Sequence, residues 1–456
     1  MRGRQARDKE RPITHILYSG STICSAACFP ASERSLAGFW GRLLIRHSSP
    51  DGGTLSPTRF RQMILFRQDE VQAVRVVIAT GRQAHYSLPA NAFARRGHKV
   101  CIYTATPRSR MRKFDPAVRT RWIPAPVAIF SGLTHWKTPL ALDELDSTLF
   151  DRCAAAALRD CDLLLGASTS SLATGMAAQR AGGIFVLDRA CPDIRVQQRM
   201  MVEEARKAGG VFRPNSPWFI ERQVEEYERA DFILSPSEYS RSSYPEHLRR
   251  KMVLAPLYGR SQVSPRSPRA AGSPFVLGVV GGQPLRKGYL YLLQAWKELA
   301  LPDALLRIRS GDAILRYPVL KDLLGQLPNV EMVGYVPDIS EFYASCDAFI
   351  LPSVDDGFGM ALFEALANGV PSIATRNCGA SELLVPERDF LLIEPFSVEQ
   401  IKESVQRLYA SRELRETLET RGPAAVQALE AGGWPRPYEN GMDQLLRTVQ
   451  QAESTI

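Results

Sequence analysis

The sequence has no apolar run long enough to cross a membrane, because no stretch approaches the roughly eighteen consecutive apolar residues of a spanning helix. Its 8 cysteines form no Cys-x-x-Cys pair and no Cys/His cluster with the spacing of zinc ligands. Cysteines scattered through a long chain are typical of reduced, cytosolic proteins. We therefore expect a cytoplasmic protein with neither a spanning helix nor a structural metal site.

Two fingerprints of nucleotide cofactor sites are also missing. No Gly-x-x-x-x-Gly-Lys-Ser/Thr motif indicates a P-loop, and no Gly-x-Gly-x-x-Gly motif indicates a nicotinamide cofactor. The formal net charge is +9, but the basic runs lack the interleaved aromatic residues that nucleic-acid binding needs. We expect no bound cofactor and no nucleic-acid partner.

Much of the positive charge lies near the start of the chain. Residues 1–73 are rich in Ser, Arg and Gly and show no sustained hydrophobic period, so we interpret them as a poorly ordered leader. Over the whole sequence, the hydrophobic content of 45% and the charged content of 23% are those of a globular protein. A length of 456 residues suits two or three domains.

After the leader, apolar strand patterns alternate with amphipathic helices. A strand at 74–80 is followed by a helix that ends near Gly97 and by a strand at 99–104, and a second such series starts at Phe275. Such units predict parallel sheets that helices cover on both faces. We expect two α/β domains around a cleft, separated by a Ser-, Pro- and Arg-rich linker: 74–258, a linker at 259–273, and 274–430.

The second series opens with a glycine-rich loop at 281–288, between the strand at 275–280 and an apolar helix. Its glycines, its adjacent cations Arg286 and Lys287, and the helix N-terminus are the groups that bind a diphosphate. A solvated turn at a helix start has the same composition. The residues alone leave both interpretations open.

A second loop of interest follows the apolar run at 348–351. It places Asp356 and the turn 357–359 before a helix that carries Glu364 and ends at Asn368-Gly369. Acids on both sides of a Gly-Phe-Gly turn can hold a polyhydroxylated ligand, while the helix N-terminus faces an anion. An ordinary β-loop-α unit with acids on its surface remains the alternative.

Three features occur here in one order: the loop at 281–288, the segment at 355–364, and the turn Asn377–Leu383. Together they resemble the donor-binding domain of the retaining glycosyltransferases of family 4, in a bacterial branch. In that family the motif acids are usually two glutamates separated by seven residues. This sequence keeps the spacing and has Asp356 at the first position.

The resemblance extends over roughly 74–446 and implies the GT-B fold, with two Rossmann-like, doubly wound parallel-sheet domains facing a cleft. It also implies that 431–456 is a helical segment returning to the N-terminal domain. On the acceptor side, Gly81, Arg82 and His85 are similar to a loop of that branch. So is Asp188-Arg189, after which the branch often carries a histidine where Asp193 stands nearby.

The resemblance further implies roles for the motif residues. Arg286 and Lys287 would neutralise the diphosphate of a nucleotide-sugar without a metal ion, and Glu364 would accept hydrogen bonds from ribose. Asp356 would hold hydroxyls of the transferred sugar. The remaining donor-binding residues would act through the backbone; they are Gly282, Gln283, Gly357, Phe358, Gly359, Gly379, Ala380 and Ser381.

The expected reaction is a metal-independent, retaining hexosyl transfer from a nucleotide-diphosphate sugar to a glycan or lipid-linked acceptor, as in polysaccharide biosynthesis. The residues 81–85 place His85 on a loop where it either contacts a substrate or faces solvent. A basic run at 108–113 is either a solvated loop or a peripheral contact with the inner face of the membrane. A sugar-nucleotide epimerase of the same fold and a non-catalytic nucleotide-sugar-binding regulator are the alternative functions.

Overall fold

The computed structural model describes residues 73–81, 86–106, 114–123, 140–257, 263, 272–334, 336 and 338–431. All of these residues belong to one compact unit, Arg59–Thr455. The expected leader (1–73), linker (259–273) and C-terminal segment (431–456) lie almost wholly outside the described residues, as does the basic run at 108–113.

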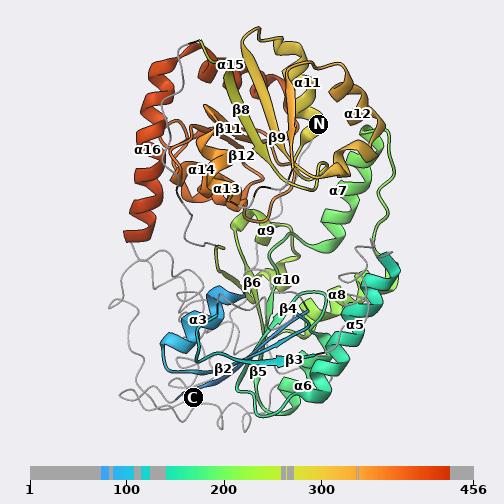
Figure 1. The fold of residues 1–456 in the computed structure, drawn as a ribbon. Helices are drawn as coiled ribbons and strands as arrows, with labels where there is room; N and C mark the ends of the chain where they lie inside the picture. Colours follow the sequence, from blue (N-terminus) through green and yellow to red (C-terminus); the bar gives the residue numbers. More distant parts are fainter. Residues whose placement is uncertain are drawn as a thin grey trace, which may run out of the picture. The chain divides into compact units, whose positions relative to one another are not determined.

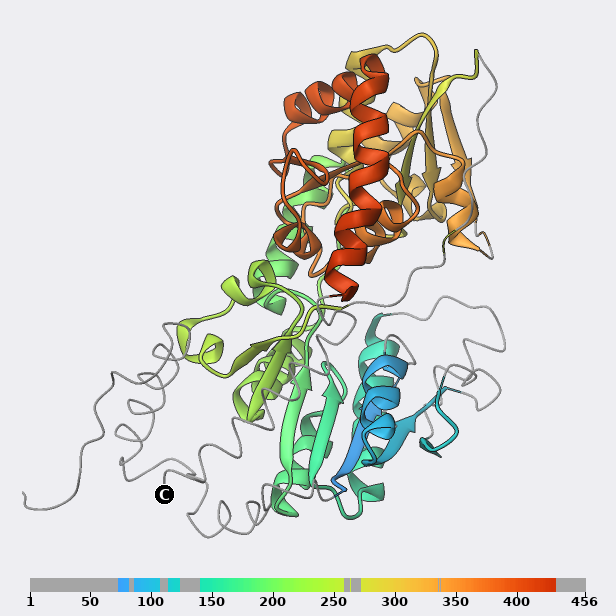
Figure 2. The same ribbon diagram turned by 90° about the vertical axis from the view of Figure 1, so that its left-hand side faces the viewer.

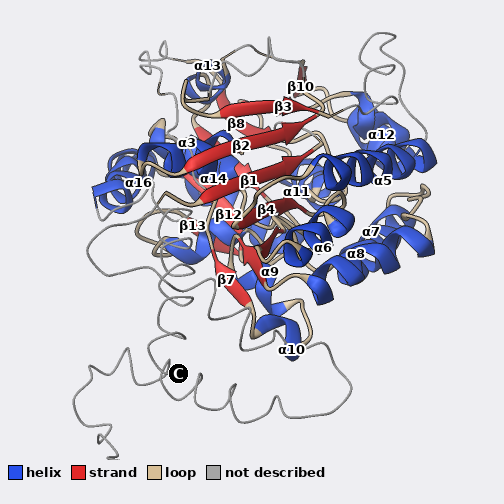
Figure 3. Cartoon of the chain, turned by 90° about the horizontal axis from the view of Figure 1, so that it is seen from below, coloured by secondary structure: helices blue, strands red, loops and turns tan. Residues whose placement is uncertain are grey.

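Within the described part of the chain, seven parallel strands form a first sheet in the order β3-β2-β1-β4-β5-β6-β7, and Figure 3 shows β3, β2, β1 and β4 in this order. The strands are β1 (Arg75–Thr80), β2 (Lys99–Thr104), β3 (Arg119–Trp122), β4 (Leu163–Ala167), β5 (Ile184–Asp188), β6 (Phe232–Ser235) and β7 (Met252–Leu254). From β1 the chain adds β2 and β3 on one side of the sheet, and from β4 it adds β5, β6 and β7 on the other side. The boundary between these strands is therefore the topological switch point, where ligands bind in doubly wound folds.

The helices of this half are α3 (Ser87–Arg95), α5 (Leu140–Ala157), α6 (Leu172–Arg180), α7 (Ile194–Lys207), α8 (Pro217–Arg229), α9 (Glu238–Ser242) and α10 (Glu246–Arg249). In β5, Ile184 and Val186 pack into one apolar cluster, and Phe185 and Leu187 pack into another. Both faces of the strand are thus buried, which explains its unbroken apolar sequence.

A second sheet contains six parallel strands among the described residues, in the order β10-β9-β8-β11-β12-β13. They are β8 (Phe275–Val280), β9 (Ala304–Arg309), β10 (Val330–Val333), β11 (Ala348–Leu351), β12 (Ser372–Thr375) and β13 (Leu391–Ile393). In β11, Ile350 faces one apolar cluster and Phe349 faces the other. The predicted pair of parallel sheets is therefore confirmed.

The second half also contains α11 (Tyr289–Leu299), α12 (Pro318–Gly325), α13 (Ile339–Ala344), α14 (Met360–Ala367), α15 (Val398–Ala410) and α16 (Arg412–Ala431), with short 3-10 turns η2 (Asp312–Arg316) and η3 (Gly379–Leu383). The long α16, red in Figures 1 and 2, lies beside α14. In the described ranges, no helix is both long enough and apolar enough to cross a bilayer.

Helix α7 follows β5 of the first sheet but packs into the core of the second. Its Met201 and Ala205 belong to the same apolar cluster as Leu293 of α11, and Figure 1 shows α7 beside α12. The Val319 amide donates to the Ala208 carbonyl oxygen at 3.2 Å, which fixes the end of α7 to the start of α12. By its position in the sequence, α7 belongs to the first half of the molecule, whereas by its packing it belongs to the second half.

Candidate functional site

The loop between β8 and α11 carries Arg286 and Lys287 side by side. The side chain of Lys287 crosses Gly281, where an added Cβ would lie 2.6 Å from Lys287 Cγ, so the crossing requires a glycine. The Lys287 amide donates to the Gln283 carbonyl oxygen at 3.0 Å and closes the turn. The Gly282 and Gln283 amides donate to no described residue. These two expected donor-binding residues therefore keep backbone donors for a ligand.

The same loop is held against the loop that follows β11. Gly288 has φ +66° and would place a Cβ 1.9 Å from the Pro352 carbonyl oxygen, so only glycine allows this approach. The Val354 amide donates to the Arg286 carbonyl oxygen at 2.9 Å. The two loops that the sequence singled out are thus adjacent, each at the end of a strand, because β8 and β11 are neighbours in the sheet.

Two ion pairs join these loops. The Lys287 ammonium pairs with the Asp356 carboxylate, and Arg286 Nε donates to Asp355 Oδ2 at 3.0 Å. Arg286, Lys287 and Asp356 are each partly exposed, whereas the Asp355 side chain is fully buried. The structure therefore brings together the cations and the first motif acid, and their side chains remain partly accessible to solvent.

Residues 357–359 form the entry to α14. The Phe358 ring stacks on Phe363 at a centroid distance of 5.6 Å, so the side chain anchors the loop in the core rather than facing a ligand. Gly359 has φ +84°, and a Cβ there would lie 2.3 Å from Cys378 Sγ. The amides of Gly357, Phe358 and Gly359 donate to none of the residues that the structure describes. Free amides before a helix N-terminus favour an anionic or hydroxylated ligand.

Glu364 lies in the second turn of α14 and is partly exposed. Its Oε2 accepts a hydrogen bond from Tyr343 Oη at 2.8 Å. Burial raises the pKa of Tyr343 well above its ordinary value, so this hydroxyl stays a neutral donor. The bond fixes the carboxylate from one side and leaves acceptor capacity on Oε1, as contact with a pair of ribose hydroxyls requires.

The expectation for Gly379, Ala380 and Ser381 needs a correction. Their amides donate to the carbonyl oxygens of Asp356 at 3.2 Å, Phe358 at 2.6 Å and Cys378 at 2.9 Å. The sequence analysis expected these amides to face a ligand, but they are already used as donors within the protein. Turn η3 instead braces the loop of Asp356, because its amides satisfy carbonyl groups that would otherwise be buried without partners.

The acceptor-side residues are only partly described. Gly81 directly follows β1, while Arg82 and His85 lie outside the described residues. Arg189 is buried and donates from Nη2 to the Pro192 carbonyl oxygen at 3.0 Å. The Asp193 carboxylate caps α7 by accepting from the Arg195 amide at 2.8 Å. Capping accounts for the acid at position 193 without a ligand.

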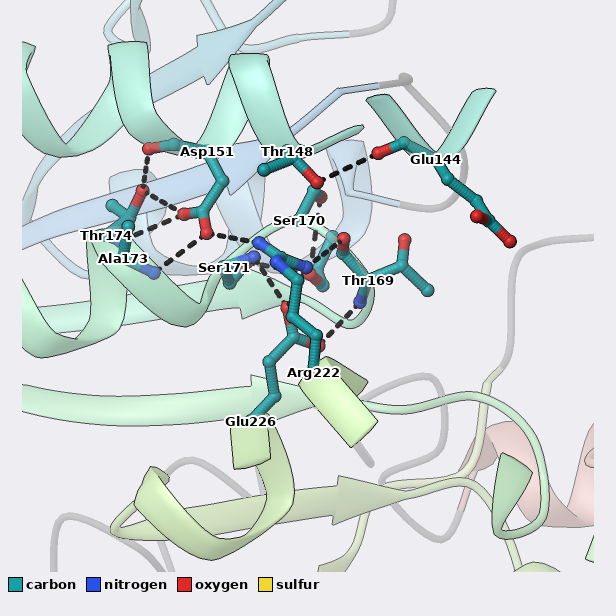
Figure 4. A network of polar contacts seen from close by, with 11 residues as sticks. Glu144, Thr148, Asp151, Thr169, Ser170, Ser171, Ala173, Thr174, Arg222 and Glu226 are labelled. Carbon is teal, nitrogen blue, oxygen red and sulfur yellow. Dashed lines mark hydrogen bonds and ion pairs between the residues drawn. The ribbon is translucent and has the colours of Figure 1, made fainter. Parts of the chain in front are cut away.

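A buried ionic network supports the loop after β4, next to the switch point of the first sheet (Figure 4). Arg222 of α8 lies between the carboxylates of Asp151 and Glu226 and donates from Nη1 to the Thr169 carbonyl oxygen at 2.7 Å. Glu226 accepts from the amides of Thr169 at 2.7 Å and Ser171 at 2.9 Å. Burial raises the pKa of Glu226 to about 7, against the opposing effect of Arg222.

This network holds Thr169 at φ +84°, a left-handed conformation that costs a β-branched residue roughly 1–3 kcal/mol. Strained residues persist where the surroundings fix them and are common at ligand sites. Asp151 also accepts from the amides of Ala173 at 2.8 Å and Thr174 at 2.9 Å, and so caps α6. The 168–171 loop is therefore a rigid, hydroxyl-rich segment next to the switch point of the first sheet.

Sequence reasoning missed the partners of Asp355. Besides Arg286, its carboxylate accepts from Gln197 Nε2 at 2.7 Å and from Tyr239 Oη at 3.2 Å. The available signal was the acid itself, directly before Asp356 and next to two cations in the neighbouring loop. In the described ranges, no group of three or more His, Cys, Asp or Glu side chains is placed to hold a metal ion.

Comparison with known proteins places a family resemblance on the second half. Residues 262–424 match the model of the family described as glycosyl transferases group 1. The capsular polysaccharide biosynthesis glycosyltransferase CapM of Staphylococcus aureus is 28% identical over 157 residues, which are 34% of this chain and 41% of that protein. This chain therefore spans less than half of the length of such curated relatives.

Solved structures resemble a larger share of the chain. Sucrose-phosphate synthase from Thermosynechococcus elongatus has a TM-score of 0.64 at 19% identity, over 83% of this chain and 100% of that one. Anabaena HepE, solved in complex with UDP, has a TM-score of 0.54 at 15% identity, over 78% of this chain and 95% of that one. These similarities confirm the predicted fold class, two Rossmann-like parallel-sheet domains of the GT-B type.

Proposed function

We propose that this chain is a glycosyltransferase that moves a hexose from a nucleotide-diphosphate sugar to a hydroxyl group of a glycan or lipid-linked acceptor. One observation carries this proposal. Arg286, Lys287 and Asp356 meet beside the free amides of 357–359, in the region that matches the glycosyltransferase family model. Cations, free amides and an acid at the ends of adjacent parallel strands suit a ligand with both phosphate and hydroxyl groups.

Each group has a distinct role towards the donor. Arg286 and Lys287 bind the diphosphate together with the amides of Gly282 and Gln283. Glu364, steadied by Tyr343, accepts hydrogen bonds from the ribose hydroxyls. When the donor enters, Lys287 exchanges part of its pairing with Asp356 for phosphate, and the carboxylate is released for hydroxyls of the transferred sugar. The ion pair between Lys287 and Asp356 thus keeps both side chains near the positions proposed for donor binding.

The proposed chemistry retains the configuration of the anomeric carbon. The bond from that carbon to the diphosphate oxygen breaks, and the acceptor oxygen bonds to the same face through an oxocarbenium-like state. The acceptor proton passes to the departing diphosphate oxygen, so no redox partner is needed. Cations fixed at the diphosphate stabilise the charge that develops there, which is usually the largest catalytic effect.

We further propose that transfer is independent of divalent metal. The leaving group gains negative charge, and the side chains of Arg286 and Lys287 supply two positive charges in the loop where it would lie. A divalent cation would otherwise serve this purpose. The acceptor is proposed to enter along the first sheet, where the 168–171 loop borders the switch point.

The test has two stages. The purified protein is first screened by thermal shift against UDP-, GDP- and ADP-sugars, and the stabilising donor is then supplied, radiolabelled, with glycan and lipid extracts. We expect label in an extract and release of free nucleotide diphosphate. A label that stays on the nucleotide as an altered sugar would identify an epimerase, and binding without turnover would identify a regulator. No stabilisation by any donor would refute the proposal.

A further inference from the structure

Asp355 is a buried acid on which three parts of the fold converge. Its side chain is fully buried, and its carboxylate accepts from Arg286 Nε at 3.0 Å, Gln197 Nε2 at 2.7 Å and Tyr239 Oη at 3.2 Å. Arg286 precedes α11, Gln197 lies in α7, and Tyr239 lies in α9. A buried carboxylate is costly unless it is paired and hydrogen-bonded, and here both conditions hold.

The geometry of Arg286 shows what this acid does to it. Nε is committed to Asp355, while Nη1 donates to Gln283 Oε1 at 2.9 Å on the exposed loop and Nη2 stands 3.9 Å from Cys191 Sγ, the distance of a weak contact. A guanidinium group is planar, so fixing Nε fixes the direction of both Nη groups. Asp355 therefore sets the edge of Arg286 that a phosphate would meet.

Tyr239, one of the two other donors to Asp355, is held firmly by its surroundings. Ser237 Oγ donates to the Gly357 carbonyl oxygen at 2.6 Å, and Glu382 accepts from the amides of Glu238 at 2.8 Å and Tyr239 at 2.5 Å. These bonds fix the start of α9 against the loops of the second sheet. Burial, and then Asp355, raise the pKa of Tyr239, so its hydroxyl stays protonated and keeps donating.

We propose that Asp355 is a positioning residue that orients Arg286 for the diphosphate and makes this orientation depend on Gln197 and Tyr239. The inference rests on the proposed function, because it assumes that Arg286 meets a diphosphate. Two side chains from outside the donor loops, with no proposed contact to the nucleotide, thereby tune diphosphate recognition. Helices α7 and α9 follow strands β5 and β6 of the first sheet, so segments continuous with that sheet act on the donor site through one carboxylate.

The experiment measures how well the protein distinguishes a nucleoside diphosphate from the corresponding monophosphate. Calorimetry gives the Kd of UMP and UDP, GMP and GDP, or AMP and ADP, using the pair that the wild type binds. The ratio of the monophosphate Kd to the diphosphate Kd isolates recognition of the second phosphate. A loss of stability alone leaves this ratio unchanged, so a purely structural role does not move it.

We expect Asp355→Asn to lower the ratio about tenfold, which corresponds to about 1.4 kcal/mol. Gln197→Met and Tyr239→Phe each remove one donor to Asp355 and should lower the ratio about threefold, on the order of one modest hydrogen bond. Asp389→Asn is the matched control. Asp389 is also buried, and it pairs with Arg388 at 2.8 Å and with the Val385 amide at 2.8 Å. We expect its ratio to stay at the wild-type value.

The outcomes separate the two proposals. A wild type that binds none of these nucleotides refutes the proposed function and, with it, this inference. A wild type that prefers the diphosphate, with an Asp355→Asn ratio within twofold of it, overturns the inference alone. A higher ratio in Asp355→Asn also overturns it, because Asp355 would then compete with phosphate for Arg286. If Asp355→Asn does not fold, Tyr239→Phe decides by the same criterion, since it removes only a hydroxyl group.

Discussion

Gly288 allows the close approach of the two donor loops, and its replacement by alanine should be unusually costly. At φ +66°, a side chain in the left-handed region costs roughly 1 kcal/mol. The added Cβ would also lie 1.9 Å from the Pro352 carbonyl oxygen, so the backbone must move by about 1.5 Å to reach ordinary contact at 3.4 Å. Overpacking of this kind typically costs about 1–3 kcal/mol. We therefore expect Gly288→Ala to destabilise the second sheet by about 2–4 kcal/mol.

Two other glycines of the same half separate these contributions. Gly369 has φ +67°, but a Cβ there would come no closer than 3.4 Å to another atom, so Gly369→Ala reports the cost of the backbone conformation alone. Gly282 has neither a positive φ nor a neighbour within 4 Å, so Gly282→Ala should leave stability nearly unchanged. The difference between Gly288→Ala and Gly369→Ala then measures the collision with Pro352.

Amide hydrogen exchange of β8 and β11 is a suitable assay, because it reports the opening of this sheet without assuming that the whole chain unfolds in one step. A collision that costs about 2 kcal/mol makes exchange in Gly288→Ala about thirtyfold faster than in Gly369→Ala. Equal exchange rates in these two variants would refute the reasoning, because the loops could then separate at no cost.

Four further predictions concern catalysis and pH. Lys287→Ala should lower the transfer rate about 10²- to 10³-fold, as loss of one fixed charge-stabilising group does. Lys297→Ala, on the exposed face of α11, should leave the transfer rate unchanged. Equal transfer rates in these two variants would exclude Lys287 from the diphosphate site. Glu364→Gln should raise the donor KM at least tenfold with an unchanged melting temperature, since a charged acceptor contributes about 1.5–3 kcal/mol, and an unchanged KM would contradict the ribose contact. The transfer activity should persist in the presence of a chelator. If the chelator abolishes the activity and manganese restores it, the Asp355-Asp356 pair would be reassigned as a metal ligand. Burial raises the pKa of Glu226 to about 7 from an ordinary 4.5, so between pH 4.5 and about pH 7 the folded state keeps a proton that the unfolded state loses. The free energy of unfolding should therefore fall as the pH rises from 4.5 to about 7. A Glu226→Gln variant whose stability falls with the same slope over this pH range would contradict the role of Glu226.

The strands that could be predicted from sequence are the ones buried on both faces. The run at 74–80 became β1 (Arg75–Thr80) because each of its inner residues packs against a helix or another strand. Strands β3 (Arg119–Trp122) and β10 (Val330–Val333) are among those that were not predicted. They lie at the edges of their sheets and all of their residues are partly or fully exposed, so these residues need not be apolar.

Some residues of the candidate site could be predicted from the local sequence, whereas others depend on contacts between residues that are far apart in the sequence. Arg286, Lys287 and Asp356 could be found because each lies in a short loop between a strand and a helix, where local sequence sets the conformation. The Gln197 partner of Asp355 is 158 residues away in sequence, and the Tyr239 partner is 116 residues away. No local pattern records such contacts. The wrong expectation for 379–381 has this cause as well, because two of the three acceptors of those amides lie in the loop after β11.

The packing of α7 has a consequence for exchanging halves between related proteins. A chimera cut at the linker would separate Met201 and Ala205 from the second-half cluster that they complete. It would also separate Glu204 from Tyr291, whose hydroxyl donates to that carboxylate at 2.9 Å. A chimera would therefore keep the second half intact only if the α7 segment, which lies within the first half of the sequence, is exchanged together with it. The structural unit that can be exchanged is thus made of two segments that are separate in the sequence.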